Sequence, residues 1–155
     1  MTAATETLIF WRYIASSLDR LVGCLDGLSK AQLNWRPDAP GANSLYALAT
    51  HTLGNAEENL LQTLVGQPVV RDRDGEFAAQ GASAQALVAR WATVRAVLAA
   101  RLADLPAGAL DVAYTHPRRG TITGREILIV VARHAAEHLG QAELTRDLLR
   151  AAGAV

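Results

Sequence analysis

Apolar residues recur every three or four positions in four separate stretches of this sequence, and this rhythm limits what the chain can fold into. A period near 3.6 residues places apolar side chains on one face of an α-helix. The stretches cover about 5–28, 43 or 44 to about 65, 83–105 and about 124–152. Amphipathic helices of this length bury their apolar faces against one another. The pattern therefore predicts an all-α four-helix bundle, formed by a single domain that spans residues 1–155.

Capping and helix-breaking residues mark the ends of these stretches. N-caps are expected at Asn43 or Ser44, at Ser83 and at Thr123, and helix breakers at Gly66, Pro68 and Pro106. Thr123 and Glu126 have the spacing of a capping box, in which each residue satisfies a backbone N–H of the other. Ser29 and Gln32 repeat this spacing and predict one short helical turn. Residues 66–81 are expected to be loop, and the segment YTHPRRG is compatible with a short extended excursion.

Charge and cysteine content exclude several classes of protein. Lys plus Arg and Asp plus Glu both number 15, so no excess charge points to nucleic acid, an anionic membrane or an acidic partner. The first apolar run is too short for a signal peptide or a membrane span, and we expect a cytoplasmic protein. Cys24 is the single cysteine, which rules out an internal disulfide and a sulfur-bound metal cluster. Any metal must therefore be held by histidine and carboxylate.

Two histidines lie one turn apart in the last stretch, which reads GREILIVVARHAAEHLGQAEL. His134 and His138 project about 40° apart on a helix, on the predicted core face with Ile127 and Val131. Side chains at this spacing have Cβ atoms about 5–6 Å apart, so both rings can reach one ion at roughly 2.0–2.1 Å. The pair therefore predicts a metal site. The alternative is two core histidines, each satisfied by a hydrogen bond to a carbonyl or to Gln141.

The second stretch carries His51 on a polar side, opposite an apolar stripe. The polar side comprises Ser44, His51, Asn55, Glu58 and Gln62, and the apolar stripe comprises Leu45, Ala49, Leu53, Leu60 and Leu64. The polar side is either the solvent-exposed face of the helix or the wall of a pocket above the metal. If it lines a pocket, the apolar stripe needs another cover, either a neighbouring helix or a second chain. We predict a homodimer on this ground, and we expect His116, in a basic loop, to be exposed.

The linker and the histidine pattern together resemble a known family. The segment LSKAQLNWRPDAPGANSLYALATH, followed much later by HAAEHLGQAEL, is similar to the DinB/YfiT-like superfamily of metalloenzymes. The resemblance implies a four-helix bundle with long crossover connections, often dimeric. It also implies that His51, His134 and His138 bind one divalent transition metal, with Zn or Ni expected, and that water fills the open positions.

The resemblance also suggests a class of reaction. Characterised members include transferases and isomerases that use low-molecular-weight thiols, so we expect a small-thiol-dependent S-transferase acting on a small-molecule substrate. Metal-dependent hydrolysis and a non-catalytic, stress-related metal-binding module are the alternatives. Glu58 and Glu137 are the acid/base candidates, although each is also compatible with a solvated surface carboxylate. His134 to His138 also fits H-x-x-E-H of inverted zinc peptidases, but the chain after His138 is too short for the distant acidic ligand.

Overall fold

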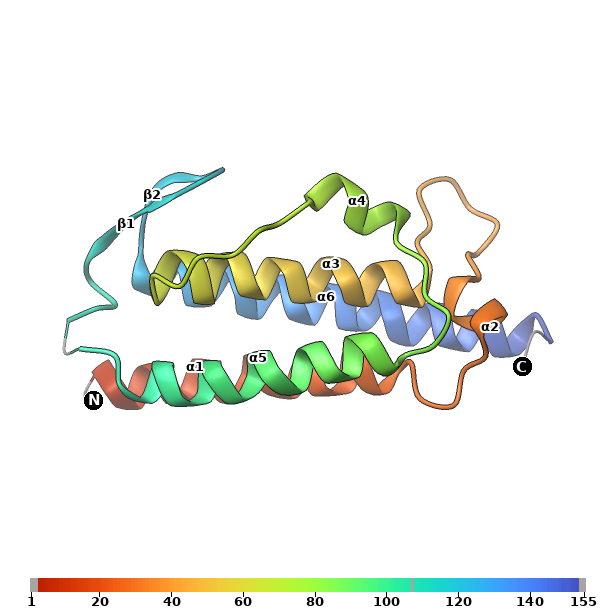
Figure 1. The fold of residues 1–155 in the computed structure, drawn as a ribbon, viewed down its shortest axis with the longest axis horizontal. Helices are drawn as coiled ribbons and strands as arrows, with labels where there is room; N and C mark the ends of the chain where they lie inside the picture. The colour runs from red at the N-terminus through yellow and green to blue at the C-terminus, as the bar shows by residue number, and fades with distance from the viewer. Residues whose placement is uncertain (1–2, 107, 154–155) are drawn as a thin grey trace.

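A computed structural model, which describes residues 3–106 and 108–153, has four long helices packed side by side (Figure 1). They are α1 (Ala3–Gly23), α3 (Leu45–Ala56) with its continuation η1 (Glu57–Leu64), α5 (Gln85–Ala103) and α6 (Gly124–Ala151). Helix α1 packs against α5 and α6, and α3 packs against α6. The predicted all-α four-helix bundle is confirmed. Within the described residues, no helix combines the length and apolar character needed to cross a membrane.

The connections are long and contain short elements of their own. They are α2 (Lys30–Asn34), α4 (Arg73–Ala78) and an antiparallel hairpin of β1 (Ala113–His116) and β2 (Gly120–Thr123). The chain between η1 and α5 runs back along the bundle, so α3 and α5 point in the same direction (Figure 1). This is a long crossover of the expected kind. The hairpin confirms the expected extended excursion, and its turn ends at Gly120, whose positive φ of 70° favours glycine.

Most helix starts follow the capping residues of the sequence. The Ser44 hydroxyl accepts a hydrogen bond from the Ala47 N–H, and the Thr123–Glu126 capping box is formed. The Ser29–Gln32 box is also formed and begins α2. Helix α5 differs from the prediction, because it begins at Gln85 after Ala84, which makes no side-chain cap, rather than at Ser83.

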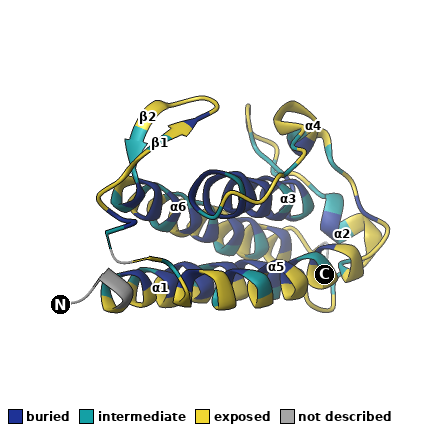
Figure 2. Ribbon diagram, turned by 60° about the vertical axis from the view of Figure 1, so that its left-hand side comes forward, coloured by how far each residue is buried: buried dark blue, intermediate teal, exposed yellow. Residues whose placement is uncertain are grey.

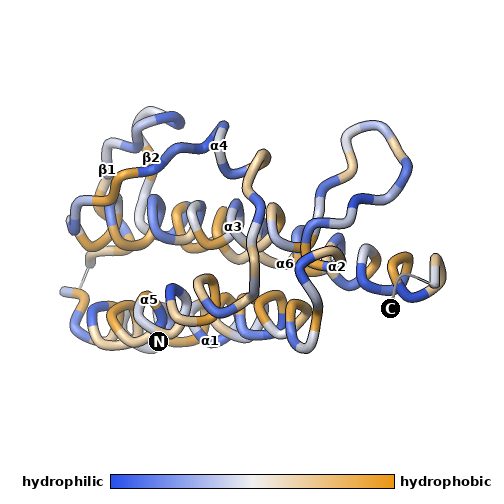
Figure 3. Tube along the Cα trace, turned by 45° about the vertical axis from the view of Figure 1, so that its right-hand side comes forward, coloured by the Kyte–Doolittle hydropathy of each residue, from blue (hydrophilic) through white to orange (hydrophobic). Residues whose placement is uncertain are grey.

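The segment 66–81 is not loop throughout, as the sequence had suggested. Asp72 caps the six-residue helix α4 by accepting a hydrogen bond from the Gly75 N–H. The chain around α4 is largely hydrophilic (Figure 3), yet Glu76 is buried in it. Helix α4 packs across α3. The close approach needs Gly54, because a Cβ atom at this position would lie 2.0 Å from Oε1 of Glu76.

Helix α3 is buried on both of its sides, as its colouring in Figure 2 shows. The apolar stripe of Leu45, Ala49, Leu53, Leu60 and Leu64 lies in the core of this single chain. On the opposite side, Ser44, His51, Asn55 and Glu58 are also buried. Of the two covers expected for this stripe, a neighbouring helix or a second chain, the structure shows the first, because helices of the same chain cover it. The homodimer stays a prediction without that support.

The predicted second helix changes its winding after Ala56. Residues Glu57–Leu64 form a π-helix, in which the Thr63 hydroxyl donates to the carbonyl of Glu58, five residues earlier. π-Helical turns are rare and occur frequently at functional sites. Glu57 and Glu58 are both buried here, Glu57 against Arg90 of α5 and Glu58 against Arg71 and Arg118.

Candidate metal centre

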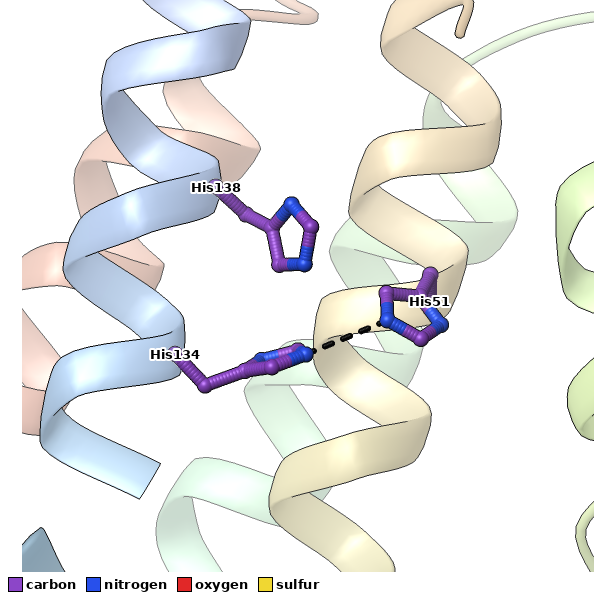
Figure 4. A group of neighbouring side chains, drawn as sticks. All are labelled: His51, His134 and His138. Carbon is purple, nitrogen blue, oxygen red and sulfur yellow. Dashed lines mark hydrogen bonds between the residues drawn. The ribbon is translucent and has the colours of Figure 1, made fainter. Parts of the chain in front are cut away.

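Three histidine side chains converge between α3 and α6, although His51 lies 83 positions before His134 in the sequence (Figure 4). One nitrogen from each of His51, His134 and His138 lies within 4.8 Å of the other two. The ring centroids of His134 and His138 are 4.3 Å apart, and each lies 5.0 Å from that of His51. The helical spacing on α6 and the packing of α3 on α6 thus bring together the three predicted metal ligands.

His51 is held by a buried carboxylate that the sequence interpretation missed. Its Nδ1 lies 2.9 Å from Oε2 of Glu76, and Arg71 binds the same carboxylate through two nitrogens at 2.6 and 2.8 Å. Because a carboxylate accepts hydrogen bonds, the neutral form of His51 carries its proton on Nδ1, and Nε2 is the nitrogen available to a ligand. A carboxylate behind a metal-binding imidazole is the usual means of fixing its tautomer and orientation.

The Glu76 carboxyl stays ionised in this buried position. Burial alone would raise its pKa, but hydrogen bonds from His51 and Arg71 and the charge of Arg71 hold the pKa below its usual value. The Phe77 ring packs against the imidazole of His51, with ring centroids 4.3 Å apart. His51 is therefore fixed both by charge-assisted hydrogen bonds and by packing.

His138 is oriented in the same manner by a different group. Its Nδ1 lies 2.7 Å from Oε1 of Gln141, so Nδ1–H donates to the amide oxygen and Nε2 keeps a free lone pair. The hydrogen bond to Gln141 is the one that the core-histidine alternative expected. It engages only one ring nitrogen, and the other is left for a ligand.

His134 is the third member of the cluster. Its Nε2 lies 3.1 Å from Nε2 of His51, while its Nδ1 is buried and has no hydrogen-bond partner among the described residues. Burial, followed by repulsion from His138 and His51, lowers the pKa of His134 to about 3. Burial likewise lowers the pKa of His138. Both rings are therefore neutral at physiological pH, which is the form that binds metal.

The separations fit one shared ion. Two nitrogens bonded at roughly 2.0–2.1 Å, with an angle of about 90–109° at the ion, lie about 2.8–3.4 Å apart. The 3.1 Å between His51 and His134 falls in this range. One nitrogen of His138 lies within 4.8 Å of a nitrogen of each of the other two histidines. The residues present could hold a metal ion.

The face of α6 differs in one respect from the sequence prediction. His134 and His138 are half-buried at the edge between α3 and α6, whereas the core positions are taken by Val131, Ala135 and Leu139. The prediction that both imidazoles point into the core was therefore wrong by a fraction of a turn. The edge position leaves the cluster open to a pocket.

The two glutamate candidates occupy different environments. Glu58 is buried, not solvated, and its carboxylate accepts from Arg71 at 3.1 Å and also from Arg118. Glu137 lies at the surface with 53% of its side chain exposed and has Arg133 as a neighbour at 3.7 Å. The surface interpretation of Glu137 agrees with this position. Neither carboxylate is a buried group free of charged partners.

His116 is buried, and the prediction that it is exposed was wrong. Its Nε2 donates to Oδ1 of Asn59 at 3.0 Å, and its Nδ1 accepts the backbone N–H groups of Arg118 and Arg119. Burial lowers the pKa of this imidazole. His116 is thus a neutral structural residue that shapes the turn between β1 and β2.

A pocket of about 330 Å³ opens beside the cluster. It is lined by His51, Asn55, Arg73, Arg118, Arg119 and His134. Arg73 belongs to α4, and Arg118 and Arg119 lie in the turn of the β1–β2 hairpin. Both elements lie in connections between the long helices, where the helical periodicity of the sequence gives no information. A small molecule in this pocket would contact two of the three histidines.

Comparison with known proteins agrees with this fold. The sequence model of the DinB superfamily matches residues 13–142. A conserved protein from Enterococcus faecalis has a similar crystal structure, with a TM-score of 0.73, 19% identity and coverage of 94% of this chain and 97% of that chain. A DinB-like protein from Bacillus cereus ATCC 10987 superposes with a TM-score of 0.70 and 20% identity over 95% of this chain and 91% of that one. No curated protein matches the sequence.

Proposed function

The chain belongs to the DinB superfamily, and from this membership we propose that it is a metal-dependent enzyme that transfers a low-molecular-weight thiol to an electrophilic small molecule. The metal is a divalent transition ion, Zn or Ni, bound by His51, His134 and His138. The thiol chemistry comes from the resemblance to thiol-dependent members of the superfamily. The site contributes the metal ligands and the space for a reactant.

One observation carries the proposal: the three-histidine cluster borders a pocket of about 330 Å³ instead of being sealed by protein. Three protein ligands with an accessible fourth position are typical of catalytic metal sites, whereas structural sites are closed by four protein ligands. An ion held there would act as a Lewis acid and lower the pKa of a thiol that reaches it.

The residues of the chain have distinct roles in this scheme. Glu76 keeps the proton of His51 on Nδ1, and Gln141 keeps that of His138 on Nδ1, so both imidazoles present Nε2. Arg71 neutralises Glu76 and keeps it ionised. In the transfer itself, the thiol sulfur forms a bond to the electrophilic carbon, the leaving group departs with the electron pair of the broken bond, and the thiol proton passes to solvent.

The other two functions fit these surroundings less well. Hydrolysis needs a general base near the ion, but Glu58 is engaged by two arginines and Glu137 lies at the surface. A non-catalytic module needs no reactant pocket beside its metal. Thiol transfer needs only a lowered thiol pKa and a place for the electrophile.

The test combines metal analysis with a transfer assay. Purified protein offered equal Zn²⁺ or Ni²⁺ is expected to bind about one ion per chain and to accelerate the reaction of a thiol such as 2-mercaptoethanol or 3-mercaptopropionate with 1-chloro-2,4-dinitrobenzene. His138→Ala should lose both properties, whereas Glu137→Ala, an exposed change one position away, should keep both. Stoichiometric metal without acceleration for any thiol in a broad panel would contradict the transferase and favour the non-catalytic module.

A further inference from the structure

The pocket beside the histidine cluster is strongly cationic. Three of its lining side chains are arginines, Arg73, Arg118 and Arg119, and none is a carboxylate. Guanidinium groups match planar carboxylates and phosphates by paired hydrogen bonds. The overall chain is neutral, so this concentration of positive charge is a local feature and not a consequence of composition.

The nearby carboxylates neutralise only part of this charge. Glu58 binds both Arg71 and Arg118, and Glu76 binds Arg71, so these two buried carboxylates balance the charges of Arg71 and Arg118 and leave those of Arg73 and Arg119. Arg73 has Asp74 at 3.8 Å, but that aspartate is 97% exposed in its side chain, where pairing is weak. Within the part of the chain that the structure describes, no hydrogen bond or ion pair reaches the Arg119 guanidinium. The pocket therefore keeps an excess of positive charge before any metal is added.

Asn55 adds an independent sign of a missing ligand. It lies one turn after His51 on α3, lines the pocket and is only 6% exposed. Its buried Oδ1 has no hydrogen-bond partner among the described residues. Buried polar groups are nearly always satisfied, and the two ends of a side-chain amide can exchange places by rotation. After such a rotation the NH2 group of Asn55 takes the place of the oxygen and can donate a hydrogen bond to an acceptor in the pocket.

We propose that the pocket binds an oxyanion group, a carboxylate or a phosphate, of the small-molecule reactant, with Arg119 and Arg73 as the principal cationic contacts and Asn55 as a polar contact. The proposal rests on the function proposed above and specifies its substrate class as anionic. The pocket volume is at the lower end for ligand sites, so the anion is a small molecule and not a polymer. Because His51 and His134 line the same pocket, an anion held by the arginines lies with the rest of the molecule beside the histidine nitrogens.

The experiment compares, on the Co²⁺-loaded protein, two thiols that have the same two-methylene spacer between the sulfur and the polar group. 3-Mercaptopropionate carries a carboxylate where 2-mercaptoethanol carries a hydroxyl, and the thiolate charge-transfer absorption reports binding of either. We expect wild type to bind 3-mercaptopropionate about tenfold more tightly, which equals about 1.4 kcal/mol. Arg119→Gln and Asn55→Ala should each reduce this preference several-fold and leave the affinity for 2-mercaptoethanol nearly unchanged. Arg150→Gln removes the same charge from the far end of α6 and should keep the full preference.

Competition at constant ionic strength identifies the preferred oxyanion. Succinate and inorganic phosphate are each titrated against bound 3-mercaptopropionate. The anion that displaces the thiol at the lower concentration shows whether the pocket prefers a carboxylate or a phosphate. Equal affinity of wild type for the two thiols, or a preference that survives Arg119→Gln, Arg73→Gln and Asn55→Ala, would overturn the anion site while leaving the metal-dependent function intact. Absence of Co²⁺ binding would instead refute the proposed function. Calorimetry of succinate and phosphate with the metal-free protein then tests the anion site by itself, and lack of binding there would refute it too.

Discussion

Replacement of Glu76 by Gln tests whether the buried carboxylate behind His51 serves the metal site. Gln keeps the size of the side chain but removes its charge. The carboxylate of Glu76 accepts hydrogen bonds from His51 and Arg71 with two oxygens, whereas a Gln amide has only one accepting oxygen. Changing a group that orients a metal-binding histidine costs typically 10–100-fold in metal affinity, or about 1.4–2.7 kcal/mol. We therefore expect Glu76→Gln to raise the Kd for Zn²⁺ by this factor.

The same substitution also affects folding, and the two effects must be separated. Removing one partner of a buried ion pair costs about 3–5 kcal/mol, and the cost here is at the lower end because Glu58 stays 3.1 Å from Arg71. The assay is competition with a chromophoric zinc chelator at pH 7.5, with urea unfolding of the metal-free protein as the measure of stability. Asp74→Asn, an equal charge change at a fully exposed position of the same helix, is the matched control. A folded Glu76→Gln protein with the zinc affinity of Asp74→Asn would refute the orienting role.

The remaining predictions concern the histidines and the assembly. His51→Ala should lose bound Zn²⁺ as completely as His138→Ala when metal per chain is measured, and full occupancy in His51→Ala would refute the three-ligand site. His116→Ala should keep its zinc but lower the free energy of unfolding by about 1–3 kcal/mol in urea, because the buried Oδ1 of Asn59 and two part-buried backbone N–H groups lose their hydrogen-bond partner. The free energy of unfolding of the metal-free protein should fall as pH falls from about 6.5 towards 3, by up to about 1.4 kcal/mol per pH unit. In this range His134 binds a proton in the unfolded chain but stays neutral in the folded one. Denaturant titrations between pH 4 and 8 check this sign. Light scattering at high concentration is expected to give the mass of a homodimer, and a monomer mass would remove that prediction.

The helices were predictable because their information is local. The apolar periodicity, the capping boxes and the helix breakers each depend on residues that are only a few positions apart in the sequence. The Ser29–Gln32 and Thr123–Glu126 capping boxes form as expected. The His134–His138 spacing is local in the same sense. The burial of α3 was not predictable in this way, because the sequence alone does not show whether its polar side faces solvent or is covered by another part of the chain. The short helix α4, in a hydrophilic segment, is that part of the chain.

The group that orients His51 was beyond sequence reasoning for the same reason, although one signal existed. Glu76 lies 25 residues after His51, in a segment whose charges resemble those of an exposed loop. Its approach depends on Gly54, where any Cβ atom would collide with the carboxylate. A glycine inside a helix costs about 1 kcal/mol relative to alanine, so its presence three residues after a candidate ligand indicates a close contact at that point. A lone helical glycine beside a metal-binding histidine is therefore a reason to search the following loop for a buried acidic partner.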